Sequence, residues 1–425
     1  MRVTLKPNKL RALLGGHPWI LDGSLEPIAL SNAPQGAKPH GQTDEAMPPK
    51  KPVSALPTST QEPTLSDGSV VDVYSDKGRF FARGLYNSHS KIRIRLYTWN
   101  ESESLDDAFW TKRISTAVDL RKELGYYSQA TRLINSEGDA LSGLIVDKYE
   151  DVLVMQATSL GILLRAEQFV QILQNVTGAK TVIVTTEPTM ARREGAPEEL
   201  TADRVFGAPV PETMVIQSGG IKYEIQLLGG QKTGFYLDQR ENRLAAAELF
   251  KGKTILDMFC YHGGFSIAAA QAGAVSCLAC DSSSKALEQV KKNALLNSVE
   301  NVETLQGDSF RILEQFKSEG KTFGGVVLDP PKFAQGKRSV QDALRGYHYL
   351  NKLGISCVAP GGFLVTCSCT GSVRREDFFD MLHGAASQAG RRIQILQQRG
   401  AAPDHPVLDS CPESDYLKCF LCRVI

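Results

Sequence analysis

The chain has 425 residues, of which 42% are hydrophobic and 22% charged, a composition typical of a globular protein with two or three domains. Its 48 basic and 47 acidic side chains give a formal net charge of +1, which excludes a highly basic nucleic-acid coat and an acidic disordered chain. No apolar run reaches the ~18 residues of a membrane span, and the opening residues lack the apolar core of a secretory signal. We therefore expect a cytoplasmic protein.

Residues 1–98 predict a small β-rich domain with an insertion. Residues 31–68 contain seven prolines and no aromatic residue, so this segment cannot bury enough surface to offset its ordering entropy and is expected to be disordered. Alternating strand patterns resume directly afterwards in VVDVY and KIRIRLYTW. Outside the insertion, residues 1–100 carry ten basic and four acidic side chains. That balance suits a nucleic-acid surface, with a merely solvated positive face as the alternative.

Residues 99–212 predict a central α+β domain. Apolar residues among charges at helical spacing indicate a helix over 105–124, with acidic residues near its start where the helix dipole favours them. Strand candidates follow at 143–147 and 151–157, and a second helix is expected over 162–177. The sequence of this acidic domain indicates no particular chemistry.

Residues 213–425 predict a doubly wound α/β domain, because strand patterns such as TILDMF, VSCLACD, GGVVLD and GGFLVTCSC alternate with helices. Ligands of such sheets bind beyond the carboxyl ends of the strands. The G-x-G-x-x-G pattern of nicotinamide enzymes and the P-loop pattern are both absent.

Acidic residues and a glycine pair follow successive strands of this domain. Asp257 ends the first strand, Gly263 and Gly264 lie in the next loop, and Asp281 ends the second strand. This pattern suits S-adenosylmethionine, which offers an ammonium, a ribose diol and an adenine amine but no pyrophosphate. A plain glycine turn is the alternative. The cofactor-binding residues expected from this pattern are Asp257, Phe259, Gly263, Gly264, Phe265, Asp281, Asp308, Ser309 and Asp329.

The fourth strand runs into Asp-Pro-Pro-Lys-Phe at 329–333. Two consecutive prolines keep Asp329 out of the following helix and hold it at the mouth of the site. Methyltransferases that act on planar amines use a related strand end with an aromatic residue in the fourth position, where this chain has Lys332. Amine methylation is therefore disfavoured, and Lys332 and Phe333 are expected to contact the substrate.

All nine cysteines lie between Cys260 and Cys422, an odd number that favours reduced thiols over a secreted disulfide framework. The two C-x-x-C pairs, Cys277 with Cys280 and Cys419 with Cys422, lie in expected strands. Residues three apart on a strand point to opposite faces, so we expect no metal site there.

Cys369 is the candidate nucleophile, because it ends a strand at the sheet edge that faces Asp329. A thiolate there can add to C6 of a pyrimidine and make C5 nucleophilic toward a methyl sulfonium. Asp329 is placed to bond the N3 and N4 edge of cytosine and, by sharing a proton, to stabilise the adduct. A structural cysteine is the alternative. Cys367, two residues earlier, is expected to be a packing residue.

The chain resembles the bacterial 23S rRNA (cytosine-C5) methyltransferase family in several segments. They are GHPWI, GGQKTGFYLDQRENR, LDMFCYHGGFS, LDPPKF, TCSCTG and APDHPVLDSCPESDYLKCFLCRV. The resemblance implies an N-terminal PUA domain, a central α+β domain and a Rossmann-like class I methyltransferase domain. It further implies S-adenosylmethionine as cofactor, 23S rRNA as partner, a homodimer, Cys369 as the single nucleophile, and Thr233 and Phe235 as neighbours of the cofactor.

Two other functions stay open. The same fold could methylate another RNA position, such as uracil C5 or a guanine nitrogen. A non-catalytic RNA-binding factor of ribosome assembly could also retain a vestigial pocket, although the intact Asp257, Gly263, Asp281, Asp329 and Cys369 argue against decay.

Deleting residues 33–65 should leave folding and methyl transfer nearly unchanged, because shortening a flexible loop costs little when its ends are already close. The yield of soluble protein and the rate of methyl transfer would be compared with those of the full chain. A loss of most of either would show that the insertion has a role of its own.

Overall fold

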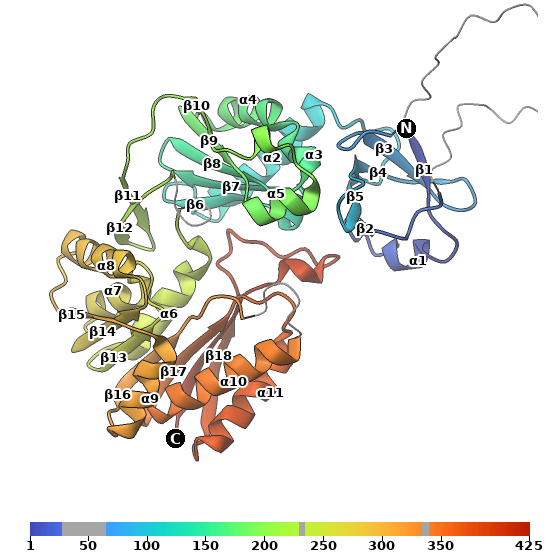
Figure 1. Cartoon of the computed structure of the whole chain (residues 1–425). Helices are drawn as coiled ribbons and strands as arrows, with labels where there is room; N and C mark the ends of the chain where they lie inside the picture. The colour runs from blue at the N-terminus through green and yellow to red at the C-terminus, as the bar shows by residue number, and fades with distance from the viewer. Residues whose placement is uncertain (28–64, 229–233, 334–339) are drawn as a thin grey trace, which may run out of the picture.

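The structure is a computed structural model that describes residues 1–27, 65–228, 234–333 and 340–425 (Figure 1). The expected insertion at 31–68 therefore lies almost entirely outside the described residues. Among those that are described, no helix combines the length and hydropathy that a membrane crossing needs.

The N-terminal sheet has the strand order β1-β3-β4-β5-β2. β1 runs parallel to β3 and pairs Arg2 with Asp72, so segments on either side of the undescribed stretch lie side by side. Val71 and Val73 point into its core, with the intervening Asp72 outward, as the period of two requires. The elements are β1 (Arg2–Thr4), α1 (Leu10–Leu13), β2 (Trp19–Leu21), β3 (Val70–Tyr74), β4 (Phe80–Tyr86) and β5 (Ile92–Thr98).

The central domain is a second sheet with the order β10-β9-β8-β7-β6. The backbone amide of Phe109 donates to the Asp106 carboxylate (2.9 Å), which caps the predicted first helix. The helix predicted over 162–177 is two helices, because the chain turns at Arg165 and the first of them packs its Gly161 against Leu85 of β4. The elements are α2 (Asp107–Glu123), β6 (Thr131–Asn135), β7 (Leu144–Tyr149), β8 (Val152–Ala157), α3 (Leu160–Leu163), α4 (Ala166–Thr177), β9 (Thr181–Thr185), α5 (Pro188–Glu194) and β10 (Arg204–Gly207).

A hairpin, β11 (Met214–Ser218) and β12 (Ile221–Ile225), precedes the C-terminal sheet. That sheet has seven strands in the order β15-β14-β13-β16-β17-β19-β18; β19 runs antiparallel to β17 and β18, and the other pairs are parallel. The predicted doubly wound α/β fold is confirmed. The elements are α6 (Arg240–Phe250), β13 (Thr254–Met258), α7 (Gly264–Gln271), β14 (Ser276–Asp281), α8 (Ser284–Leu296), β15 (Val302–Gln306), α9 (Ser309–Ser318), β16 (Phe323–Leu328), α10 (Val340–Ser356), β17 (Val358–Ser368), α11 (Arg375–Gln388), β18 (Ile393–Arg399) and β19 (Lys418–Val424).

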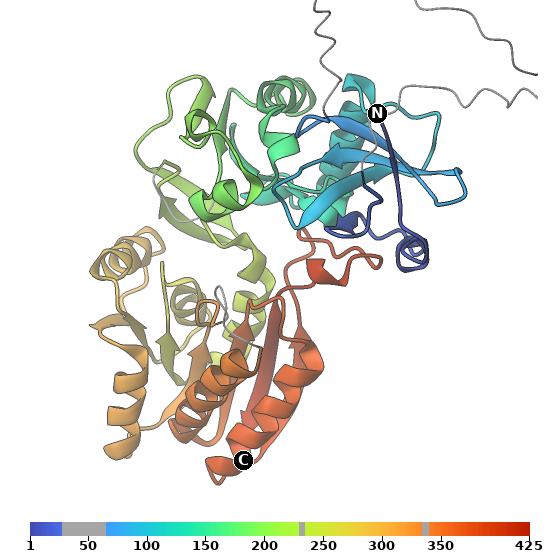
Figure 2. The same cartoon turned by 45° about the vertical axis from the view of Figure 1, so that its right-hand side comes forward.

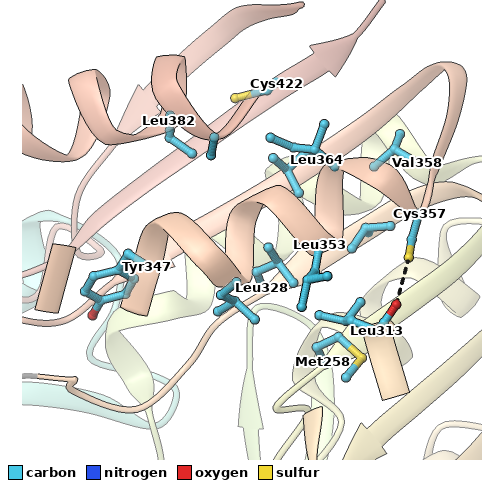
Figure 3. Packing of buried hydrophobic residues seen from close by; sticks show 14 of the residues in the cluster. Met258, Leu313, Leu328, Tyr347, Leu353, Cys357, Val358, Leu364, Leu382 and Cys422 are labelled. Carbon is cyan, nitrogen blue, oxygen red and sulfur yellow. Dashed lines mark hydrogen bonds between the residues drawn. The ribbon is translucent and has the colours of Figure 1, made fainter. Parts of the chain in front are cut away.

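Helices cover both faces of this sheet. α9, α10 and α11 pack on one face, where Leu328 and Leu364 of the strands meet Leu353 of α10 (Figure 3). α6 and α7 pack on the other face. Each C-x-x-C pair is divided between the two faces, because the first cysteine of each pair belongs to the α6 side and the second to the α10 side. Neither pair brings two sulfur atoms to one point.

Residues 400–417, the joining segment between β18 and β19, connect the domains. In Figures 1 and 2 this segment, coloured red, rises from the C-terminal sheet and lies between that sheet and the N-terminal parts of the chain. At its centre the buried carboxylate of Asp404 accepts hydrogen bonds from the Thr131 hydroxyl (2.9 Å) and the Arg132 amide (3.1 Å). Arg240 of α6 lies 3.4 Å from the same oxygen, and His405 contacts the other oxygen at 2.9 Å. The segment thus joins the central domain to the C-terminal domain.

Replacing Asp404 by Asn should lower the free energy of unfolding by about 3 kcal/mol, because the buried Arg240 would lose its counter-charge. The neighbouring cations hold the pKa of Asp404 below its ordinary value of 3.8, despite burial. Its contribution is therefore present above pH 4 and is lost as the pH falls further. Urea unfolding of the wild type and of Asp404→Asn, at pH 7 and below pH 4, measures the difference in their free energies of unfolding. That difference should be smaller at the lower pH.

The matched control is Asp151→Asn, which removes an exposed ion pair with Lys180 (2.8 Å). It should leave the unfolding midpoint almost unchanged. Equal effects of the two substitutions would contradict the role assigned to Asp404.

Candidate functional site

The first acid of the predicted cofactor site is buried at the end of β13. Asp257 accepts hydrogen bonds on Oδ2 from the Ser266 amide (3.0 Å) and hydroxyl (2.7 Å). Its Oδ1 has no hydrogen-bond partner within the described residues. Burial raises the pKa of this carboxyl to about 7. The unpaired oxygen is therefore ready to receive a donor from a ligand.

The loop after β13 is held in an unusual conformation. Phe259 and Tyr261 adopt positive φ angles of 63° and 48°, a region that side chains other than glycine rarely occupy. The Tyr261 amide donates to Asp281 Oδ2 (3.0 Å), and the Ser283 amide donates to Oδ1 (2.9 Å). Asp281 therefore fixes the loop against the end of the second strand.

The two glycines make room for groups of the protein itself. Gly263 has φ +78°, and a Cβ there would lie 3.0 Å from Val290. A Cβ on Gly264 would lie 2.4 Å from Arg243 Nε. The structure therefore gives these two glycines a packing reason. The helix after the loop, α7, begins at Gly264.

Two further polar groups lie at this loop, and neither was predicted from the sequence. Arg243 Nε and His262 Nδ1 are buried without a hydrogen-bond partner among the described residues. The guanidinium of Arg243 lies 4.8 Å from the ring centre of the buried Phe235. Burial, and then Arg243, lowers the pKa of His262 to about 4, so its ring is neutral at pH 7. The sequence signals were that Arg243 ends the family-like segment GGQKTGFYLDQRENR and that His262 lies in LDMFCYHGGFS.

These unpaired atoms fit S-adenosylmethionine. Asp257 Oδ1 can accept from its ammonium, and Arg243 can donate to its carboxylate. Asp281, at the second strand end, can accept from its ribose hydroxyls. The donor and acceptor types left unsatisfied in the protein are therefore those that the amino-acid end of this cofactor needs.

The other predicted cofactor residues differ in their exposure and in the groups they contact. Asp308 is exposed and caps α9 by accepting from the Arg311 amide (3.0 Å), while Ser309 is buried behind it. The side chain of Phe265 is buried in the core between α7 and the strands. Thr233 lies outside the described residues.

Cys369 directly follows β17 and is partly exposed, whereas the other eight cysteines are buried. Its sulfur lies 4.0 Å from the carbonyl oxygen of Pro330, so the thiol rests against the segment that begins with Asp329. Gln239 donates to Asp329 Oδ1 (3.1 Å). Cys369 and Asp329 are therefore brought together, as their positions after neighbouring strands predicted.

Cys367 has the packing role that the sequence predicted. It is fully buried in β17 and pairs in register with Cys419 of β19. Burial, and then the adjacent Cys419, raises the pKa of its thiol well above the ordinary value. A thiol in that state does not supply a nucleophile at neutral pH.

Two residues near the end of the chain, Tyr416 and Lys418, lie close to the strand end that carries the thiol, and neither was predicted from the sequence. The Lys418 ammonium donates to the carbonyl oxygens of Thr370 (2.7 Å) and Tyr416 (2.8 Å). The Tyr416 hydroxyl donates to Asp238 Oδ2 (2.6 Å). Of the two predicted substrate residues, Phe333 packs its ring 4.6 Å from that of Tyr347, and Lys332 is exposed.

One group of potential metal ligands lies elsewhere, where His17, Cys411 and Glu413 come within 4.8 Å of one another. His17 Nδ1 accepts from the Trp19 amide (3.1 Å), so in the neutral ring Nε2 carries the proton and donates to Glu413 (3.2 Å). Nε2 is therefore not available to a metal ion. The group is better described as a hydrogen-bonded contact between the N-terminal domain and the joining segment.

Comparisons with known proteins agree with this geometry. Residues 170–423 match the S-adenosylmethionine-dependent methyltransferase family, and residues 55–99 match a PUA-like domain. SMU.776, solved in complex with SAH, shares the fold over 100% of both chains, with a TM-score of 0.79 and 20% sequence identity. The fold and the site thus define an S-adenosylmethionine-dependent methyltransferase, and S-adenosylmethionine is its cofactor.

Relatives named ribosomal RNA large subunit methyltransferase I align over the whole chain. The protein from Pseudoalteromonas atlantica is 35% identical over 100% of this chain and 99% of its own length. The Escherichia coli O127:H6 protein is 32% identical over 100% of both. The chain belongs to the ribosomal RNA large subunit methyltransferase I family, and the resemblance stated from the sequence is confirmed.

The affinity for S-adenosylhomocysteine should rise about tenfold between pH 6 and pH 8, because only the ionised Asp257 pairs with the ligand ammonium and its pKa is about 7. The ammonium of S-adenosylhomocysteine itself stays protonated between pH 6 and pH 8, so the change comes from Asp257. Isothermal titration calorimetry at several pH values measures the dissociation constants.

Asp257→Asn should bind weakly with no pH dependence. Asp281→Asn, the matched control, should also weaken binding but keep the dependence. A wild-type affinity that is constant between pH 6 and pH 8 would contradict the assignment of Asp257.

Proposed function

We propose that the protein is a cytoplasmic enzyme that methylates C5 of a cytosine in 23S rRNA through a covalent adduct with Cys369. The names of its relatives support the RNA class, and the PUA-like domain supports RNA binding. The observation that carries the mechanism is the position of the one partly exposed thiol, which lies against the Asp329-Pro330 segment beside the cofactor loop. A homodimer, which the resemblance implies, stays a prediction.

The chemistry assigns separate tasks to the thiol and the carboxylate. The Cys369 thiolate forms a bond to C6, and the electron pair of the C5–C6 double bond makes C5 nucleophilic. When bound, S-adenosylmethionine would supply the electrophilic methyl group: its sulfonium–methyl bond would break as the bond to C5 forms, leaving S-adenosylhomocysteine. Loss of the C5 proton to a base then restores the double bond and expels the Cys369 thiolate. The enzyme is regenerated without any change in its oxidation state.

Asp329 orients the base in this proposal. It stands at the end of β16 and is held by Gln239, so it can bond the N3 and N4 edge of a cytosine. A carboxyl that shares a proton with N3 would stabilise the negative charge that the addition places on the ring. Lys332 and Phe333 come after the two prolines that follow Asp329. Lys332 is exposed and Phe333 packs on Tyr347, and both are proposed to contact the RNA.

Cys369→Ala should abolish methyl transfer while leaving cofactor binding intact. Cys367→Ala, the matched control on the same strand, should lower the stability more than the turnover, because Cys367 is a buried packing residue. Turnover would be measured by methyl incorporation into 23S rRNA lacking the modification, and cofactor binding by calorimetry.

An RNA carrying 5-fluorocytosine at the target should trap the wild-type enzyme covalently, because fluorine cannot leave as a proton. Peptide mapping should place the adduct on Cys369. An adduct on Cys367, or full activity of Cys369→Ala, would overturn the proposal and favour methylation of a nitrogen atom.

A further inference from the structure

Lys418 is a buried cation directly behind the candidate nucleophile. Lys418 is 1% exposed. In the pairing of β19 with β17 it stands opposite Ser368, the residue before Cys369. Its ammonium donates to the carbonyl oxygens of Thr370 and Tyr416. The lysine therefore holds the backbone on both sides of the thiol.

The charge of Lys418 is not used in a structural ion pair. Within the described part of the chain, no carboxylate oxygen lies within 4.0 Å of its ammonium. Removing an ammonium from water is costly unless a partner compensates for the loss. Two neutral carbonyl oxygens compensate only in part, so an anion nearby would be stabilised strongly.

The charged and titratable groups near Lys418 include two that can carry a negative charge, the Asp415 carboxylate and the Cys369 thiol. The pKa of Lys418 is lowered to about 8, chiefly by burial; Asp415 and then Cys369 act to raise it, and the cations of Arg375 and Lys332 act with burial to lower it. At pH 7 the protonated form is therefore in the majority. The electrostatic coupling is reciprocal, so an ammonium that a thiolate stabilises also stabilises that thiolate.

We propose that Lys418 is a positioning residue that favours the thiolate form of Cys369 and fixes the chain that presents it. The inference rests on the proposed role of Cys369 as nucleophile. The thiol loses its proton to solvent, and Lys418 keeps its own proton throughout. Lys418 does not touch the substrate base in this proposal, and its effect is exerted through the charge on sulfur.

The test measures the sulfur directly and needs no RNA. Full-length protein is treated with iodoacetamide between pH 6 and pH 10, and the alkylation rate at Cys369 is followed by peptide mass analysis. The other eight cysteines are buried, so their alkylation should not interfere. Lys418→Met should slow the reaction at pH 7 by about tenfold, with a midpoint about one pH unit higher and a similar rate at pH 10.

Two variants control for other causes. Lys292→Met removes a lysine that is 59% exposed and should leave the pH curve unchanged. Lys418→Arg keeps the positive charge and should retain most of the rate at pH 7. A purely structural role would slow alkylation equally at every pH or leave it unchanged, and either result for a folded Lys418→Met protein would overturn the proposal.

A second measurement uses the wild-type protein, in case Lys418→Met does not fold. The titration of Lys418 is followed by NMR of protein with isotope-labelled lysine, before and after Cys369 is converted to its neutral carbamidomethyl form. The midpoint of Lys418 should fall by about one pH unit, because a stabilising anion has been removed. An unchanged midpoint would overturn the proposal. Full methyl transfer by Cys369→Ala would instead overturn the proposed function, whatever these titrations show.

Discussion

The carboxylate of Asp404 is out of reach of water, so protein groups must satisfy it, and those groups come from different parts of the chain. Thr131 and Arg132 belong to β6, Arg240 belongs to α6, and His405 is its own neighbour. Arg240 also donates to Ser218 of the hairpin (3.0 Å). Because an unpaired buried charge is so unfavourable, these elements are held in one arrangement. The position of the joining segment, and of the strand that follows it, depends on this arrangement.

The N-terminal domain is held by a second set of buried polar contacts. The carboxylate of Glu194 in the central domain accepts from the Ser90 hydroxyl (2.6 Å) and from the side-chain amide of Asn87 (2.9 Å). The guanidinium of Arg95 lies 3.6 Å from the same carboxylate. Glu137 accepts from the indole of Trp19 (2.9 Å). Such contacts have strict geometry, so the PUA-like domain has a defined orientation toward the thiol. An RNA bound there would be presented to the site from a fixed direction.

The parts of this structure that the sequence predicted are those with local signals. The alternation of strands and helices shows in the apolar periodicity, and Asp257, Asp281, Asp329 and Cys369 could be found because each ends a strand. Lys418 could not be found in this way, since its acceptor Thr370 is 48 residues distant in the chain. Asp404 contacts Thr131 across 273 residues. β18 was missed because its edge position leaves most of its residues exposed.

The strand β19 lies between β17 and β18, both of which precede it in the chain. Until it is inserted, β17 has no partner on that side and Lys418 is absent from behind the thiol. The strands that carry the cofactor loop, β13 to β16, pair with one another and do not need it. The two halves of the site therefore depend on the chain's last strand to different degrees: the cofactor half is built from strands that pair without β19, whereas the nucleophile half is complete only with β19 in place.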